Sequence, residues 1–132
     1  MDLNRQYGSD ESAAQNGKWF DLPGQGRIQI ARGDNRKAVH YALKLRSARS
    51  HLLTEVTVDA LEAAEQIATK VIARYILLGW ENVFVDGTKI EYSVEAAERI
   101  LTEFPMFKNQ IRSIADNAAM FRAQELIDVE KN

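Results

Sequence analysis

The sequence predicts an α+β fold, a mainly α-helical single domain with small β-hairpins near the N-terminus and in the middle. Apolar residues recur at the 3.6-residue helical period over most of the second half of the chain. Short β-favouring segments flank two turn sequences, Pro23-Gly24-Gln25-Gly26 and Asp86-Gly87. The length of 132 residues suits one domain with a core.

The first 17 residues are polar, with Leu3 and Tyr7 among their few sizeable apolar side chains. So little apolar surface does not offset the entropy lost on ordering a segment. We therefore expect residues 1–17 to form a flexible polar tail and residues 18–132 to form the domain.

The domain is predicted to begin with a hairpin and a helix. Trp19, Phe20 and Leu22 precede the first turn, and Ile28 and Ile30 alternate with polar residues after it. Asp34 or Asn35 is expected to cap the helix that follows, in which Val39, Ala42 and Leu43, with Leu45, have helical spacing. Residues 50–56 either continue this helix or form a connection.

The longest predicted helix runs from about Val58 to Leu78, with Thr57 as its N-cap and Gly79 as its C-terminal stop. Its predicted core stripe consists of Leu61, Ala64, Ala68, Val71, Ile72 and Tyr75. The opposite face carries Glu62, Gln66, Lys70 and Arg74. We expect this helix to be the centre of the core.

A second hairpin is predicted over residues 83–92, with Asp86-Gly87 as its turn. Ser93 is expected to cap a third helix, and Pro105 to interrupt it. A fourth helix should start near Met106 or Phe107. Its predicted stripe consists of Phe107, Ile111, Ile114, Ala118 and Phe121.

Composition argues against several classes of function. The 17 basic and 19 acidic residues leave a formal charge of −2, which disfavours general nucleic-acid binding. The chain has no cysteine, so disulfides, thiolate metal sites and cysteine nucleophiles are excluded. The polar start lacks a secretory signal, and the longest apolar run, Val71 to Trp80, is too short to span a membrane. We expect a soluble, cytoplasmic protein.

No motif for catalysis or cofactor binding is recognisable. His40 and His51 are the only histidines, and the glycines at 24, 26 and 33 match neither a dinucleotide fingerprint nor a phosphate-binding loop. The acidic residues fall on expected solvent faces of helices. We therefore expect no catalytic residue, no cofactor and no metal.

Two groups of residues remain as candidates for binding. Most of the large aromatic residues should lie in the core, but Trp80, Phe84 and Phe107 are candidate protein-binding residues, since exposed aromatics often anchor interfaces. The basic residues Arg32, Arg36, Lys37, Lys44, Arg46 and Arg49 form the one local electropositive concentration. We interpret it as a solvated helix surface, with an acidic partner or nucleic acid as the alternative.

The second half of the chain carries an ordered series of residues that resembles a known family. The series is Gly79-Trp80-Glu81-Asn82-Val83, Asp86-Gly87, Ile90, Tyr92-Ser93, Glu95-Ala96, Leu101, Phe104-Pro105, Phe107, Ile111, Ala115, Asn117 and Phe121. Trp19, the segment 28–32 and Asp34-Asn35 precede it. Over residues 18–125 this order resembles the tail assembly chaperones of long-tailed bacteriophages.

The resemblance implies a non-catalytic phage or prophage protein that binds the tape-measure protein and helps to recruit tail-tube subunits during tail assembly. It implies action in the cytoplasm of the infected or lysogenic host, absence from the mature virion, and an ability to self-associate into dimers or rings. Nucleic acid and membranes are not expected partners. Two alternatives stay open: a structural head-tail completion or tail-terminator protein, and an enzyme whose site has no recognisable motif.

Overall fold

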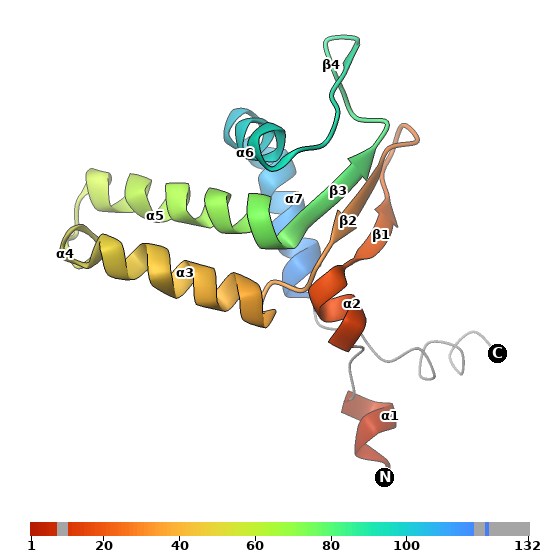
Figure 1. The fold of residues 1–132 in the computed structure, drawn as a ribbon, viewed down its shortest axis with the longest axis horizontal. Coiled ribbons are helices and arrows are strands. Elements are labelled where there is room, and N and C mark those ends of the chain that lie inside the picture. Colours follow the sequence, from red (N-terminus) through yellow and green to blue (C-terminus); the bar gives the residue numbers. More distant parts are fainter. Residues whose placement is uncertain (8–10, 118–120, 122–132) are drawn as a thin grey trace.

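The computed structural model describes residues 1–7, 11–117 and 121, and its centre is a three-stranded sheet with helices against one face (Figure 1). The helices are α1 (Leu3–Tyr7), α2 (Glu11–Asn16), α3 (Arg36–Ala48), α4 (Ser50–Leu53), α5 (Val58–Val71), α6 (Val94–Glu103) and α7 (Pro105–Asp116). The strands are β1 (Lys18–Asp21), β2 (Arg27–Ile30), β3 (Leu77–Glu81), β4 (Phe84–Val85) and β5 (Thr88–Lys89). This arrangement confirms the predicted α+β class.

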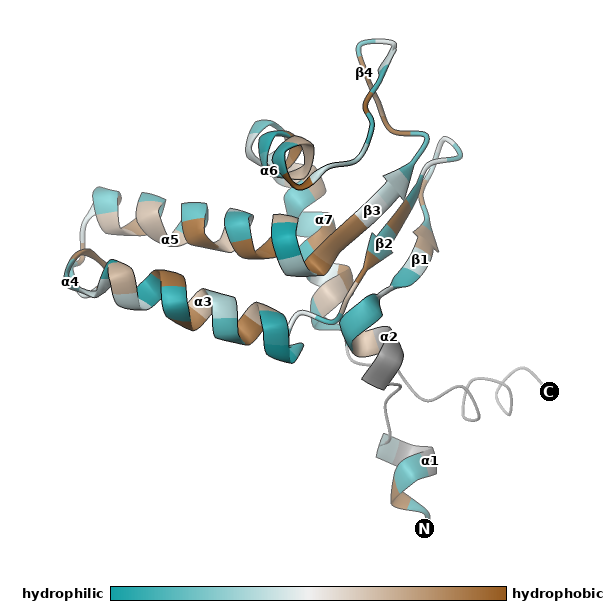
Figure 2. Cartoon of the chain, in the orientation of Figure 1, coloured by the Kyte–Doolittle hydropathy of each residue, from teal (hydrophilic) through white to brown (hydrophobic). Residues whose placement is uncertain are grey.

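The order β1-β2-β3, antiparallel throughout, places β2 in the centre of the main sheet. Phe20 pairs with Ile28, and Ile28 pairs with Trp80, so these three residues share the face that packs on the helices. Hydrophobic residues gather along β2 and β3 (Figure 2). The core against this face includes Ile72, Ala97, Ile100, Leu101, Ile111 and Phe121.

The other face of the sheet is polar around Arg27. Its guanidinium lies 3.4 Å from a carboxylate oxygen of Asp21 and 3.4 Å from one of Glu81. It also lies 4.9 Å from the centre of the Trp19 ring. The predicted alternation of Ile28 and Ile30 with polar residues is confirmed over β2, with the isoleucines inside and Arg27 outside, and it ends at Ala31, which is buried next to Ile30.

The predicted helix over Val58–Leu78 is wrong at its C-terminal end. Helix α5 ends at Val71, a π-helical turn spans Ile72–Ile76, and residues 77–81 form β3 instead of ending a helix at Gly79. The physical reason is tertiary pairing: the Ala31 N–H donates a 2.8 Å hydrogen bond to the Ile76 carbonyl, and β3 supplies the partner that β2 needs. Such pairing overrides local helix propensity.

Helices α3 and α5 lie side by side and extend away from the sheet, joined by α4 at the far end (Figure 1). We call residues 36–71 the arm. Its close contacts use small residues, since Ala38, Ala60 and Ala63 are buried. Leu61, which was predicted to lie in the core stripe, is 66% exposed, and Val39 and Leu43, whose spacing predicted an apolar face of the first helix, are exposed as well. The predicted polar face of α5 is confirmed.

The predicted caps and the second hairpin are confirmed. The side chains of Asn35, Thr57 and Ser93 accept hydrogen bonds at the N-termini of α3, α5 and α6. Strands β4 and β5 pair across Asp86 and Gly87, whose φ angles of 50° and 81° are those of a tight hairpin turn.

The last helix starts slightly earlier than predicted, because Pro105 occupies its first turn, where the missing N–H costs nothing. Lys108, Ile111 and Ala115 are its buried residues. Helix α7 ends at Asp116, so Phe121 does not lie on its stripe as predicted, although Phe121 is buried in the core; Ala118 lies outside the described residues.

The segment predicted as a flexible tail contains helices α1 and α2, which the sequence pattern did not indicate. Ala14 is buried, and its carbonyl accepts a 3.0 Å hydrogen bond from the Arg32 N–H. The Asn16 carbonyl accepts another, of 2.8 Å, from Gln29. The end of the segment is therefore part of the fold. Among the described residues, no helix is both long and apolar enough to cross a membrane.

Candidate binding groove

Three segments distant in sequence meet at one end of the sheet and enclose an apolar cavity of about 520 Å³. They are the β1–β2 turn, the start of the β4–β5 hairpin and the corner between α6 and α7. We call this cavity the groove. The residues that line it are Leu22, Pro23, Gly24, Gly26, Asn82, Val83, Phe84, Val85, Ile100, Glu103, Phe104, Pro105, Met106 and Phe107.

The corner between α6 and α7 follows from Pro105. The residue before a proline avoids helical geometry, and Phe104 has φ −122° and ψ 81°, outside the helical region. Helix α6 therefore ends and α7 begins without a loop. The sharp corner presents Phe104 and Met106 to solvent on the rim of the groove instead of burying them along one continuous helix.

The opposite wall is the β4–β5 hairpin, which projects from the fold and carries hydrophobic residues (Figure 2). Phe84 on β4 is 57% exposed. A 3.3 Å hydrogen bond from the Asn82 side chain to the Gln25 carbonyl joins the base of this wall to the β1–β2 turn. This hydrogen bond adds to the β2–β3 pairing of Arg27 with Glu81, which joins the same two walls of the groove.

The groove is suited to an apolar occupant. Phe84 and Met106, which is 86% exposed, stand on facing segments of its rim, and Glu103 is the one charged residue among the described residues that line it. Contiguous exposed apolar surface on a soluble protein is typical of a binding site. The lining offers dispersion and hydrophobic contacts, which favour the apolar stripe of a helix or an extended apolar segment.

Two of the three predicted binding residues meet in the groove, namely Phe84 and Phe107. The third, Trp80, lies elsewhere: it is 7% exposed and its ring packs edge-on against Tyr92 at 5.1 Å. Its indole Nε1 donates a 2.7 Å hydrogen bond to the Ile90 carbonyl, at the base of the hairpin. Trp80 therefore positions the wall that carries Phe84.

Sequence reasoning missed the lining contributed by Leu22, Pro23, Phe104 and Met106. A signal for part of it was present, because Phe104-Pro105-Met106-Phe107 places three large apolar residues around an enforced helix break. A break of this kind exposes side chains that a continuous helix would distribute around its axis. The approach of the β1–β2 turn depends on the sheet and has no local signal.

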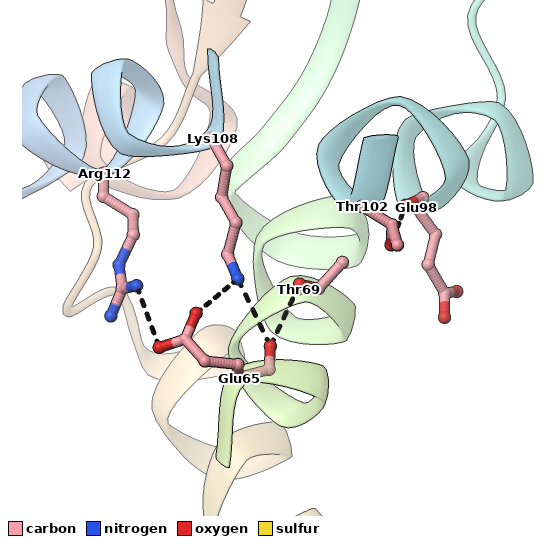
Figure 3. A network of polar contacts seen from close by, with 6 residues as sticks. All are labelled: Glu65, Thr69, Glu98, Thr102, Lys108 and Arg112. Carbon is pink, nitrogen blue, oxygen red and sulfur yellow. Dashed lines mark hydrogen bonds and ion pairs between the residues drawn. The ribbon is translucent and has the colours of Figure 1, made fainter. Parts of the chain in front are cut away.

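A second site of interest is polar and lies between α5 and α7 (Figure 3). The buried Lys108 ammonium is 2.7 Å from a Glu65 carboxylate oxygen and donates a 3.3 Å hydrogen bond to the Glu65 carbonyl. Arg112 lies 3.6 Å from the other carboxylate oxygen. Thr69 and Thr102 donate hydrogen bonds to main-chain carbonyls of their own helices.

This polar network is satisfied internally. The hydrogen bond from Lys108, with the positive charges of Lys108 and Arg112, holds the pKa of Glu65 below its ordinary value against the opposing effect of desolvation. Because the carboxylate is committed to two cations of α7, we assign the network a structural role in joining α7 to the arm. The described residues include no group of three or more His, Asp or Glu placed to hold a metal ion.

The remaining predicted features lie away from the groove. His40 and His51 are exposed on α3 and α4. The predicted basic cluster lies mainly along α3, where Arg36, Lys37, Lys44 and Arg46 are all exposed.

Comparison with known proteins places most of the chain in one family. Residues 27–132 match the family model described as YdaY prophage protein. The matched region includes β2, the arm, β3 and most of the groove lining. No curated protein and no solved structure matches the chain.

Proposed function

The chain belongs to the YdaY prophage protein family, and from this premise we propose that it is a non-catalytic tail assembly chaperone of a phage or prophage. In this role it binds the tape-measure protein, keeps apolar helices of that protein in solution and helps to recruit tail-tube subunits. The observation that carries the proposal is the groove, a preformed apolar surface on a protein of prophage origin.

The groove supports recognition of an amphipathic helix. Such a helix presents apolar side chains at positions i, i+3, i+4 and i+7, and the groove offers aromatic and aliphatic side chains on several walls. Phe84, Phe104 and Met106 give it adaptable edges, since methionine side chains adjust to irregular surfaces. A holder of many different apolar helices needs this adaptability more than a close fit to one ligand.

A binding role also accounts for the chemistry of the lining. Acid-base and nucleophilic catalysis need at least two polar groups that act together, and Glu103 is the one titratable side chain along the described lining. We expect the protein to act in the cytoplasm of the host bacterium and to be absent from the mature virion, because a chaperone leaves the tail when assembly is complete.

The proposal is tested by co-expression with the tape-measure protein encoded in the same prophage. We expect the chain to keep that protein in the soluble fraction and to co-purify with it. The double variant Phe84→Ser/Met106→Ser should lose both effects, because it removes the apolar rim. Leu3→Ser is the control, since Leu3 is 64% exposed, a value between those of Phe84 and Met106, but lies on α1, away from the groove. Equal activity of wild type and the double variant would contradict the proposal.

The main alternative is a structural virion component, which differs from a chaperone in whether it is present in the finished particle. A head-tail completion or tail-terminator protein stays in finished particles, whereas a chaperone does not. Mass spectrometry of purified virions distinguishes the two, with this chain expected to be absent. Its presence in stoichiometric amounts would replace the chaperone role with the structural one.

A further inference from the structure

The two long helices of the arm differ in charge. Between Asp34 and Glu55 the sequence contains no acidic residue, and α3 carries Arg36, Lys37, Lys44 and Arg46, all exposed. No ion pair joins these four side chains to any residue within 1–7, 11–117 or 121. The outer surface of α3 is therefore basic and electrostatically unpartnered.

The outer surface of α5 has the opposite sign at the tip of the arm, the end that also carries Lys44 and Arg46, whereas Arg36 and Lys37 lie at the end of α3 near the sheet (Figure 1). Asp59 and Glu62 are exposed on its first turns, and Glu55 precedes the helix. None of these three carboxylates forms an ion pair with the part of the chain that the structure describes. Farther along α5, Glu65 is already paired with α7. The acidic surface is thus confined to the tip.

Each charged surface surrounds an exposed apolar pair. On α3 these are Val39 and Leu43, one helical turn apart, and Leu43 is 62% exposed. On α5 they are Val58 and Leu61, also about one turn apart and both exposed. Two helix surfaces with apolar centres and opposite charged borders have the features that direct specific helix pairing.

We propose that the arm is a self-association surface, in which α3 of one copy packs on α5 of a second copy. Val39 and Leu43 then bury against Val58 and Leu61, with the lysine and arginine borders against Asp59 and Glu62. When both copies exchange these contacts, each arm contributes two helices to a four-helix bundle. Contacts exchanged reciprocally close around a two-fold axis, so the product is a dimer.

A second copy fits the basic surface better than nucleic acid does. A phosphate backbone would complement the cations of α3 but would leave Val39 and Leu43 without an apolar partner. The neighbouring carboxylates of α5 would also repel it. The outer surface of α5 in a second copy offers both carboxylates for the cations of α3 and an apolar pair for Val39 and Leu43.

The proposed dimer leaves the groove open. None of the described lining residues of the groove belongs to α3 or α5. Self-association through the arm and capture of an apolar segment in the groove are therefore independent, and either can fail without the other. A dimer would carry two grooves, which favours binding to a long partner with repeated apolar segments.

The test is a charge exchange between the two surfaces, read by light scattering on a size-exclusion column at low ionic strength. The basic-surface variant is Lys44→Glu/Arg46→Glu, and the acidic-surface variant is Asp59→Lys/Glu62→Lys. We expect the wild type to be a dimer and each variant to be a monomer, because each variant places like charges across both contacts. Circular dichroism checks that both variants are folded.

An equimolar mixture of the two variants should form a heterodimer, since each contact then joins opposite charges again. The chain with all four substitutions should dimerise by itself for the same reason. Raised salt should weaken the wild-type dimer at concentrations that screen exposed charges. The control Lys89→Glu makes the same type of charge reversal at an exposed residue of the β4–β5 hairpin, outside the arm, and should leave the dimer intact.

Three results would overturn the proposal. A wild type that stays monomeric at every accessible concentration excludes self-association. Folded variants that remain dimeric separately place the interface elsewhere. Tight binding of duplex DNA by wild type, lost in the basic-surface variant, reassigns α3 to nucleic acid.

Discussion

The indole Nε1 of Trp80 donates a 2.7 Å hydrogen bond to the Ile90 carbonyl, and the Ile90 N–H donates one of 2.8 Å to the Val83 carbonyl. Strand β3 is thereby connected to the two segments at the base of the β4–β5 hairpin, which contain Val83 and Ile90. Tyr92 adds a third connection through a 2.8 Å hydrogen bond from its hydroxyl to the Leu77 carbonyl. The exposed Phe84 thus stands on a hairpin whose base is held by the buried Trp80 and the partly buried Tyr92.

Trp80→Phe should destabilise the protein by about 1–3 kcal/mol, because the Ile90 carbonyl loses its donor in a partly buried place. Urea unfolding measures this free energy. Hydrogen exchange of the Ile90 amide should also accelerate relative to amides of α5, since the base of the hairpin opens more readily. Unchanged exchange at Ile90 would show that the hairpin does not depend on Trp80.

Glu65→Gln should reduce stability at neutral pH by about 1 kcal/mol, a value lowered by the half-exposed position of the carboxylate. The folded state holds the pKa of Glu65 below its unfolded value of about 4.3. The stabilisation is therefore complete above that pH and is lost as the pH falls through the lower, folded-state pKa. Urea unfolding of variant and wild type should converge in acid.

Glu91→Gln is the control for this pH dependence. Glu91 is exposed, lies outside the arm and makes no ion pair with the described residues, so its effect should be small at all pH values. A Glu65→Gln deficit that persists unchanged in acid would mean that the carboxylate acts through packing alone.

Gly17→Ala should be more damaging than Gly24→Ala, although both glycines have a positive φ of nearly the same size, 82° and 83°. Each substitution incurs a backbone cost of about 1–2 kcal/mol. At Gly17 the new Cβ would also lie 3.1 Å from the carbonyl carbon and oxygen of Ile30, whereas no atom lies within 4 Å at Gly24. Thermal unfolding compares the two, and equal losses would imply that the segment before β1 is not packed on β2.

Asn35→Ala should cost more than Thr57→Ala. Both residues cap helices, and loss of such a cap costs about 1 kcal/mol. Asn35 is buried and its side-chain amide also donates to the carbonyls of Arg32 and Tyr75, at 2.6 and 3.1 Å. The Arg32 carbonyl keeps the backbone N–H of residue 35 as a donor, but the Tyr75 carbonyl loses its side-chain donor, which adds about 1–3 kcal/mol. Chemical denaturation of the two variants under identical conditions checks the difference.

Features encoded by neighbouring residues were predictable from the sequence. The three caps, the Asp86-Gly87 turn and the break at Pro105 each depend on side chains within a few positions, and the structure has all of them. Strand β3 was not predictable in this way. Leu77 and Leu78 continue a helical pattern, and only the hydrogen-bonding requirement of β2, far away in sequence, converts them into a strand.

The groove likewise combines residues that could be predicted from their neighbours in sequence with residues whose positions depend on distant contacts. Phe84 and Phe107 were identifiable as candidates because aromatic residues beside a turn or a helix break are often exposed. Trp80 looked equivalent in sequence, but its burial depends on Tyr92 and Ile90, which fold back over it. Likewise the predicted core stripe of the long helix included Leu61 and left out Ile67, whereas in the structure Ile67 is buried and Leu61 is exposed.

The π-helical turn over Ile72–Ile76 connects α5 to β3 without any intervening loop. Its end is held from the side by the Ala31 and Asn35 hydrogen bonds to Ile76 and Tyr75. Helix α5 therefore continues through this turn directly into the strand that bears Trp80. We therefore expect a molecule bound at the tip of the arm to determine the orientation of the groove as well, because α5, β3 and the hairpin that carries Phe84 follow one another in the fold.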